Sequence, residues 1–300
     1  MVRLSEIYTL IRELKMKTYQ IEYVNSTNLG NLQKFKELLR YLELNNFDFF
    51  KNEIQILKES EIYSTTQNNL DIFNKTAFSE VYRTGTFISD SIKSLQIILE
   101  RIVPTSTETD FLIKFPKPSD FQMLLKDMGE IQKHISIIVN DDSVNSSAEI
   151  HNWEYGSYWI NLTLGSMLAV KLLGDITWSS AYISTQINKQ KEQELLLREM
   201  EARVEMIEEL KETQSKYLNK LIDNEITHIS KEHFSDENRE RDKKIKNTIK
   251  LFSEIIQRGG EFQPSLISPQ EIKDSYPDFN TIEFIESKVK QITHIPESKR

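Results

Sequence analysis

The chain has 300 residues, a formal net charge of −8 and 28% charged residues. It contains no cysteine, which excludes disulfides, thiolate catalysis and cysteine-based metal sites. The acidic balance argues against a nucleic-acid footprint over the whole chain, so no nucleic-acid partner is expected. The low numbers of glycines and prolines, 8 and 7, favour long helices with few tight turns.

The first segment, residues 1–104, is predicted to be an N-terminal helical bundle. Its apolar residues recur at spacings of three and four, the helical period, as between Leu32 and Leu42. Pro104 is expected to end the last helix of the bundle. The first residues lack the apolar stretch of a secretory signal, so we expect a cytoplasmic protein.

Residues 105–165 are predicted to form a small β-α-β-β element. The apolar run 111–115 indicates a strand, and Ser119 is expected to begin a helix with Gln122 in a capping box. Residues 158–164 alternate between apolar and polar, which is typical of a half-buried strand. Gly156-Ser157 fits a two-residue hairpin turn before that strand.

Residues 166–260 are predicted to be a long helix with an antiparallel return helix. No stop signal follows Ser166 before about Phe234, so an unbroken helix would be on the order of 100 Å long. Polar residues weaken a coiled-coil seam near Lys211–Lys216, so a bend or helical hairpin there is an open alternative. The return helix spans about 238–257. The apolar seam positions of the long helix are Leu197, Met200, Val204, Ile207, Leu218 and Leu221.

The last segment, residues 261–300, is predicted to be a tail with one short helix carrying Ile282, Ile285 and Val289. The expected fold is therefore mostly α, of the α+β class.

The three tryptophans lie within one short segment that precedes and enters the long helix. Exposed aromatic side chains often mark partner-binding surfaces. We expect Trp178 to be part of the core, and we keep Trp153 and Trp159 as candidate partner-binding residues. Trp159 lies beside Asn161 on the more polar face of its strand, so it is expected to be the more exposed of the two.

Known catalytic patterns are missing from the sequence. It has no phosphate-binding loop, no dinucleotide-binding glycine motif and no nucleophile elbow, and its five histidines lack metal-binding spacing. We therefore predict no catalytic residue, no cofactor and no metal. A basic cluster at 239–250 is expected to pair with the acidic segment 192–212 if the two helices pack together.

The stretch 156–170 carries no charge, and Lys171 and Asp175 are the next charged residues. One hypothesis is a membrane segment, inserting about 158–187, with Lys171 and Asp175 paired inside it. The favoured interpretation is a buried helix that packs on the small sheet, with both charged residues at its rim. The uncharged run is shorter than the roughly 20 residues that a spanning helix needs.

The arrangement from residue 111 to 188 resembles a pattern found in uncharacterised bacterial proteins. It runs strand, helix, Trp-containing strand, Gly-Ser, strand, small-residue helix and long charged helix. The resemblance implies a bacterial or phage origin and suggests a role in bacterial defence or a mobile element. The residues that carry it are Trp153, Gly156, Ser157, Trp159, Gly165 and Gly174.

The leading functional prediction is a non-enzymatic assembly or adaptor protein. Its long amphipathic helix would bind a protein partner or a second copy of the chain, with a homo-oligomer expected. The alternative is the membrane-acting effector. An enzyme whose site is assembled from dispersed polar residues is a third hypothesis, because catalytic triads are recognised by geometry rather than by sequence order.

Overall fold

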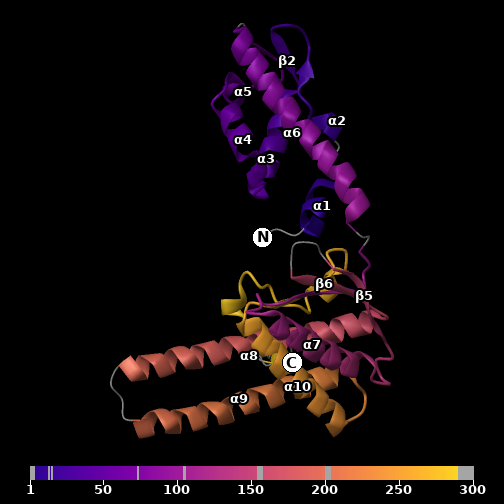
Figure 1. Cartoon of the computed structure of the whole chain (residues 1–300), viewed down its shortest axis with the longest axis vertical. Helices are drawn as coiled ribbons and strands as arrows, with labels where there is room; N and C mark the ends of the chain where they lie inside the picture. Colours follow the sequence, from indigo (N-terminus) through magenta and orange to yellow (C-terminus); the bar gives the residue numbers. More distant parts are fainter. Residues whose placement is uncertain are drawn as a thin grey trace, which may run out of the picture. The chain divides into compact units, whose positions relative to one another are not determined.

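The computed structural model describes residues 4–12, 14, 16–72, 74–103, 106–153, 158–199 and 204–289 (Figure 1). Its contacts divide the chain into two compact units, residues 1–105 and 106–300. Helices predominate in both units and each contains a small antiparallel sheet. The predicted class, mostly α within α+β, is confirmed.

Unit 1 is built from short helices around one long helix, with a three-stranded antiparallel sheet in the order β1-β2-β3. The predicted apolar face between Leu32 and Leu42 is buried in its core. The sheet was not predicted, because its strands have only two or three residues. The elements are α1 (Leu4–Arg12), α2 (Met16–Tyr19), β1 (Glu22–Tyr23), β2 (Asn28–Gly30), α3 (Leu32–Leu44), η1 (Asp48–Phe50), α4 (Lys51–Lys58), α5 (Glu61–Ser64), β3 (Leu70–Asp71) and α6 (Lys75–Ile102).

The described part of unit 2 contains a four-stranded antiparallel sheet and four long helices, of which α9 and α10 pack against α8 and α7 packs against α10. Its elements are β4 (Asp110–Lys114), α7 (Phe121–Val139), β5 (Ala148–Trp153), β6 (Trp159–Leu164), α8 (Met167–Glu199), α9 (Val204–His233), α10 (Arg239–Gln257), β7 (Glu261–Pro264), α11 (Gln270–Lys273) and η2 (Ile282–Phe284).

The sheet of unit 2 has the strand order β5-β6-β4-β7. The predicted β-α-β-β segment supplies three strands. The fourth, β7, comes from residues that were predicted to be tail, and it pairs with β4 so that Ile113 lies opposite Phe262. Pro264 ends this edge strand, where a missing N–H is tolerated, and its presence hid the strand in the sequence. The predicted Gly156-Ser157 turn lies outside the described residues.

Helix α7 begins one residue later than predicted. Asp120, rather than Ser119, is the N-cap, and its side chain accepts a hydrogen bond of 2.8 Å from the Met123 backbone N–H. The predicted capping box with Gln122 is therefore wrong. That hydrogen bond, together with one from the Ser119 hydroxyl, lowers the pKa of the Asp120 carboxyl, because both stabilise its charged form.

The prediction of one unbroken helix from 166 to 234 is wrong. The chain reverses between Glu199 and Val204, and α8 and α9 pack against each other as an antiparallel hairpin (Figure 1). The contacts Asp175–His233, Ser179–Glu225 and Glu194–Lys211 show the opposite chain directions. The open alternative of a hairpin is confirmed, but its reversal lies before 211–216.

The helical part of the candidate membrane segment 158–187 lies largely in the core of unit 2. Described residues from Ala169 to Ile183 include many of its fully buried side chains, which pack against α10 and the sheet. No helix in the described part of the chain combines the length and apolarity required to cross a membrane. Asp175 is buried rather than at the rim, and Lys171 pairs with Glu232.

The predicted last helix is wrong for Ile282 and Ile285, whereas Val289 lies in helical backbone that begins at Lys288, where the described residues end. Ile282 begins a single 3-10 turn that ends at Phe284, and Ile285 has extended backbone. Residues 290–300 lie outside the described part of the chain.

Candidate functional site

The distal parts of α8 and α9 form a two-helix projection, which we call the helical arm: the described residues 186–199 and 204–221. Figure 1 shows the two helices running side by side away from the sheet toward a common end. Thr185 and Ile222, which adjoin the arm, are buried, whereas no described side chain within the arm is buried. The rest of unit 2 therefore covers the hairpin only at its base.

Polar contacts link the two helices of the arm. Lys211 forms an ion pair of 2.9 Å with Glu194, and the Gln214 side-chain amide donates to the Gln193 carbonyl oxygen at 3.3 Å. Partly exposed ion pairs contribute little to stability, typically under about 1 kcal/mol. These polar contacts therefore add little to the stability of the arm.

Several predicted seam residues belong to the arm. Leu197, Ile207, Leu218 and Leu221 are half-buried, and Leu221 also packs against the core of unit 2. Met200, a further seam position, lies outside the described residues. Val204 begins α9, and its side chain is outside the described part of the structure.

Apolar side chains that the seam pattern did not include are exposed on the arm. Leu195 and Leu196 are each 58% exposed, and Tyr217 is 50% exposed. Three adjacent leucines at 195–197 cannot all face one neighbouring helix, because successive residues point about 100° apart. Part of this apolar surface is therefore available to another molecule.

The tryptophans lie differently from the prediction. Trp159 is buried, at 6% exposed, and the Lys114 amino group lies over its ring, whereas Trp153 at the end of β5 is 38% exposed. The expectation that Trp159 is the more exposed residue is therefore wrong, since side chains on both faces of β6, such as Ile160 and Asn161, are buried. Trp178 is half-buried, and its indole N–H donates to the Glu286 carbonyl at 2.9 Å.

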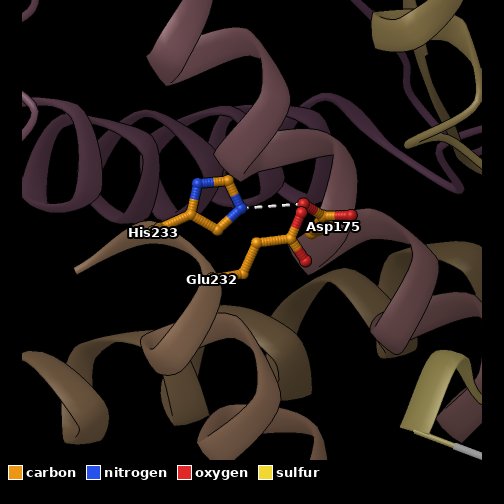
Figure 2. A group of neighbouring side chains, drawn as sticks. All are labelled: Asp175, Glu232 and His233. Atoms are coloured by element: carbon orange, nitrogen blue, oxygen red, sulfur yellow. Dashed lines mark hydrogen bonds and ion pairs between the residues drawn. The ribbon is translucent and has the colours of Figure 1, made fainter. Parts of the chain in front are cut away.

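A buried polar cluster fixes the base of the arm. Figure 2 shows Asp175 of α8 facing His233 and Glu232 at the end of α9. Asp175 and His233 have side chains only 3% and 2% exposed, and the His233 Nε2 atom lies 2.7 Å from an Asp175 carboxylate oxygen. Ligand atoms of Asp175, Glu232 and His233 all lie within 4.8 Å of one another. Two carboxylates and one imidazole are groups that could hold a small metal ion.

Two lysines balance the charges of this cluster. The Lys288 amino group donates to the second Asp175 oxygen at 2.5 Å, and Lys171 lies 3.0 Å from Glu232. A bound cation would have to displace both ammonium groups from the carboxylates. The cluster therefore fits a clamp between α8, α9 and the C-terminal segment better than it fits a metal centre.

Burial alone would raise the pKa of Asp175, since it disfavours the carboxylate. The hydrogen bond from His233 and the positive charge of Lys288 outweigh burial and hold the pKa below its ordinary value. Burial also raises the pKa of the Tyr276 hydroxyl, which donates to the Val170 carbonyl at 2.8 Å. Asp175 is therefore charged and Tyr276 neutral at physiological pH.

A second buried contact lies between the clamp and the arm. Glu225 of α9 is fully buried and accepts hydrogen bonds from Ser179 of α8, at 2.8 Å, and from Ser287 of the C-terminal segment. Both carboxylate oxygens are thus occupied by hydroxyl donors. Together with the Asp175 cluster, this contact fixes the direction in which the arm leaves unit 2.

The basic cluster of α10 is engaged locally. Lys246 pairs with Asp223 at 2.6 Å, and Arg241, which is buried, binds Asp236 and covers the Phe234 ring. These partners lie outside the acidic segment 192–212. These contacts of the described residues therefore do not support the prediction that the basic cluster pairs with the acidic segment.

Unit 1 carries a separate apolar groove between α4 and α6, with a volume of about 1310 Å³. Ile56, Phe87 and Ile98 line it and are exposed, and charged residues such as Glu80 and Arg83 alternate along its edge. Its lining mixes both charge signs along one helix. The groove therefore gives no comparable indication of what binds there.

Comparison with known proteins gives one match of uncharacterised function. The chain is 22% identical over 292 residues to the Bacillus subtilis (strain 168) protein described as "Uncharacterized protein YqaP", covering 92% of this chain and 93% of that protein. No family model matches the chain, and no solved structure matches it. The predicted resemblance to uncharacterised bacterial proteins is confirmed.

The polar clamp was missed at the sequence level. In the sequence Asp175 is a rare charge in an apolar stretch, but its partners His233 and Lys288 are 58 and 113 residues away. No fixed spacing links such residues. The one available signal was the presence of an acid within a buried helix, which requires a partner.

Proposed function

We propose that this protein is a non-enzymatic assembly or adaptor protein that binds a helical partner through its arm. The single observation behind the proposal is the uncovered hairpin, in which no described side chain between 186 and 221 is buried. Amphipathic helices normally cover their apolar stripe against further elements. A helix or helix pair from another molecule would complete such a bundle.

The rigid base of the arm supports a binding role. The Asp175 and Glu225 contacts hold α9 against α8 inside unit 2, on the core side of the arm. A binding surface on a fixed element loses less conformational freedom on association than one on a loose segment. The arm thus presents its exposed leucines in a defined orientation.

The origin and location of the protein are part of this proposal. The likeness to a Bacillus protein is compatible with a cytoplasmic role in bacterial defence or a mobile element, as the sequence pattern suggested. The membrane-acting alternative draws its candidate segment from residues that pack in the core of unit 2. The adaptor role is therefore preferred.

The test is the double substitution Leu195→Ser with Leu196→Ser. Loss of this exposed apolar surface is expected to weaken association at least about tenfold, because each leucine contributes roughly 1 kcal/mol or more when covered. Sedimentation velocity would measure self-association, and co-purification from a bacterial host would detect other partners.

The matched control is Leu266→Ser with Ile267→Ser, two neighbouring exposed apolar residues of unit 2 outside the arm. This variant should associate like the unsubstituted protein. Equal association of all three proteins, with an unchanged set of partners, would rule out the arm as the binding surface.

A further inference from the structure

The charges of the arm are divided between its two halves. The tip, residues 192–199 and 204–212, contains seven acidic and two basic residues, a net charge of −5. The root half, residues 186–191 and 213–221, contains four lysines and no acidic residue. These lysines are Lys189, Lys191, Lys216 and Lys220. The arm is therefore a bipolar surface with opposite charges at its two ends.

We propose that the partner of the arm is the arm of a second copy of this chain, docked antiparallel so that each tip lies against the partner's root half. This inference rests on the proposed function. The two halves match in length on α9, where residues 204–212 and 213–221 each span about 13 Å at 1.5 Å per residue. The opposite charges then face each other over the full overlap.

The orientation follows from the same charges. In a parallel pair the two tips, each at −5, would face each other, and so would the two lysine groups. Like charges in contact disfavour an arrangement, whereas complementary charges fix register and orientation. A two-fold axis near the boundary of the halves places each tip on the opposite root half, as in closed dimers with identical contacts.

Apolar side chains are divided in a compatible way. The tip carries the exposed Leu195 and Leu196, and the root half carries the exposed Tyr217. An antiparallel pair brings the leucines of one chain into the region of the other chain's tyrosine. The product is a four-helix bundle, in which facing helices cover each other's apolar side chains.

The lysines of the root half are accessible to a second chain. Lys216 pairs with Glu212 at 2.7 Å, but both side chains are largely exposed, so this pair is weak and exchangeable. Lys189 and Lys220 are exposed. Lys191 donates to Gln257 at 2.7 Å, which orients it without neutralising its charge.

Charge reversal at exposed positions tests the pairing. A tip variant, Glu208→Lys, Glu209→Lys and Glu212→Lys, changes the tip to a net +1. A root variant, Lys189→Glu, Lys216→Glu and Lys220→Glu, changes the root half to −2. All six side chains are exposed, so both variants should fold, which circular dichroism and thermal melts would verify.

The unsubstituted protein should sediment as a dimer that weakens at high salt. Each variant alone should associate at least about tenfold more weakly, because its tip and root half then carry the same sign. An equimolar mixture should recover the dimer, since every tip then faces a root half of opposite sign.

Cysteine cross-linking tests the orientation, because the natural chain contains no cysteine. A mixture of Glu209→Cys and Lys220→Cys proteins should give a mixed cross-linked dimer with a short bismaleimide. Dominant cross-linking of Glu209→Cys to itself would overturn the antiparallel arrangement.

A folded, unsubstituted protein that stays monomeric at high concentration would overturn this inference. If the unsubstituted protein nevertheless co-purified with a different host protein and the Leu195→Ser, Leu196→Ser variant did not, the adaptor function would stand with that protein as the partner. If the equimolar mixture of folded variants forms no dimer, pairing of the tip with the root half is likewise excluded.

Discussion

Asp175 shows how one residue can organise the base of a projecting element. Its carboxylate lies in the core of unit 2 and has partners on two other segments, His233 and Lys288. A buried charge is tolerated when it is paired and hydrogen-bonded, and removing one partner leaves the others uncompensated. The direction of the arm therefore depends on this carboxylate.

Replacing Asp175 by alanine is expected to lower the free energy of unfolding by about 3–5 kcal/mol, because Lys288 and His233 lose their common acceptor. Urea denaturation would measure the loss. The matched control is Asp223→Ala, which removes an exposed ion pair with Lys246 and should cost no more than about 1 kcal/mol. Equal costs would contradict the assignment of Asp175 as a buried clamp.

The stabilisation by Asp175 should depend on pH. Its pKa is lower in the folded chain than in the unfolded chain, so protons bind the unfolded state more readily. The contribution is complete above the ordinary aspartate pKa and disappears as the pH falls through the lower, folded-state pKa. The difference in unfolding free energy between the natural protein and Asp175→Asn should shrink in acid; a difference that stays constant would argue against this linkage.

At the scale of elements, close packing between α8 and the segment after α11 requires a glycine. A Cβ atom at Gly174 would lie 2.1 Å from the Ser275 hydroxyl and 2.7 Å from the Tyr276 ring. The ring is held by the hydrogen bond from its hydroxyl to Val170, so it cannot easily move away.

Gly174→Ala is therefore expected to destabilise unit 2 by about 1–3 kcal/mol through overpacking. Gly129→Ala, in the exposed part of α7, is the matched control, since a Cβ there meets nothing within 4 Å. That change should stabilise the helix by up to about 1 kcal/mol. Thermal melts that shift in the same direction for both variants would show that the close contact at Gly174 is absent.

The elements of this chain differ in how far the sequence predicts them. Long periodic segments such as 121–139 and 239–257 were recognised as helices, because their apolar spacing is strong. The reversal between α8 and α9 was not located, since residues 200–203 contain neither Gly nor Pro. Long-range packing decides where such a helix turns back.

The candidate site was predicted only in part. A periodic seam identified Leu197 and Leu218, which lie on the arm, but it assumed one continuous rod. The clamp around Asp175 depends on residues distant in the sequence, and the surface exposure of Leu195 depends on the absence of covering elements. Both are properties of tertiary structure, which local patterns do not contain.

At the scale of the whole molecule, our central claim is that the arm stays uncovered until another helical surface binds it. The proximal parts of α8 and α9 are buried by α10 and the sheet, whereas the arm between 186 and 221 has no described buried side chain. Segments with few buried contacts open more readily than core segments. The two regions of the same helices should therefore behave differently in solution.

Amide hydrogen exchange as a function of protein concentration tests this claim most directly. In dilute protein, peptides from 186–221 should exchange much faster than those from 167–184, and their protection should rise as the concentration favours association. Arm peptides that are already as protected as the core in dilute, monomeric protein would show that the hairpin needs no partner, and would contradict the account.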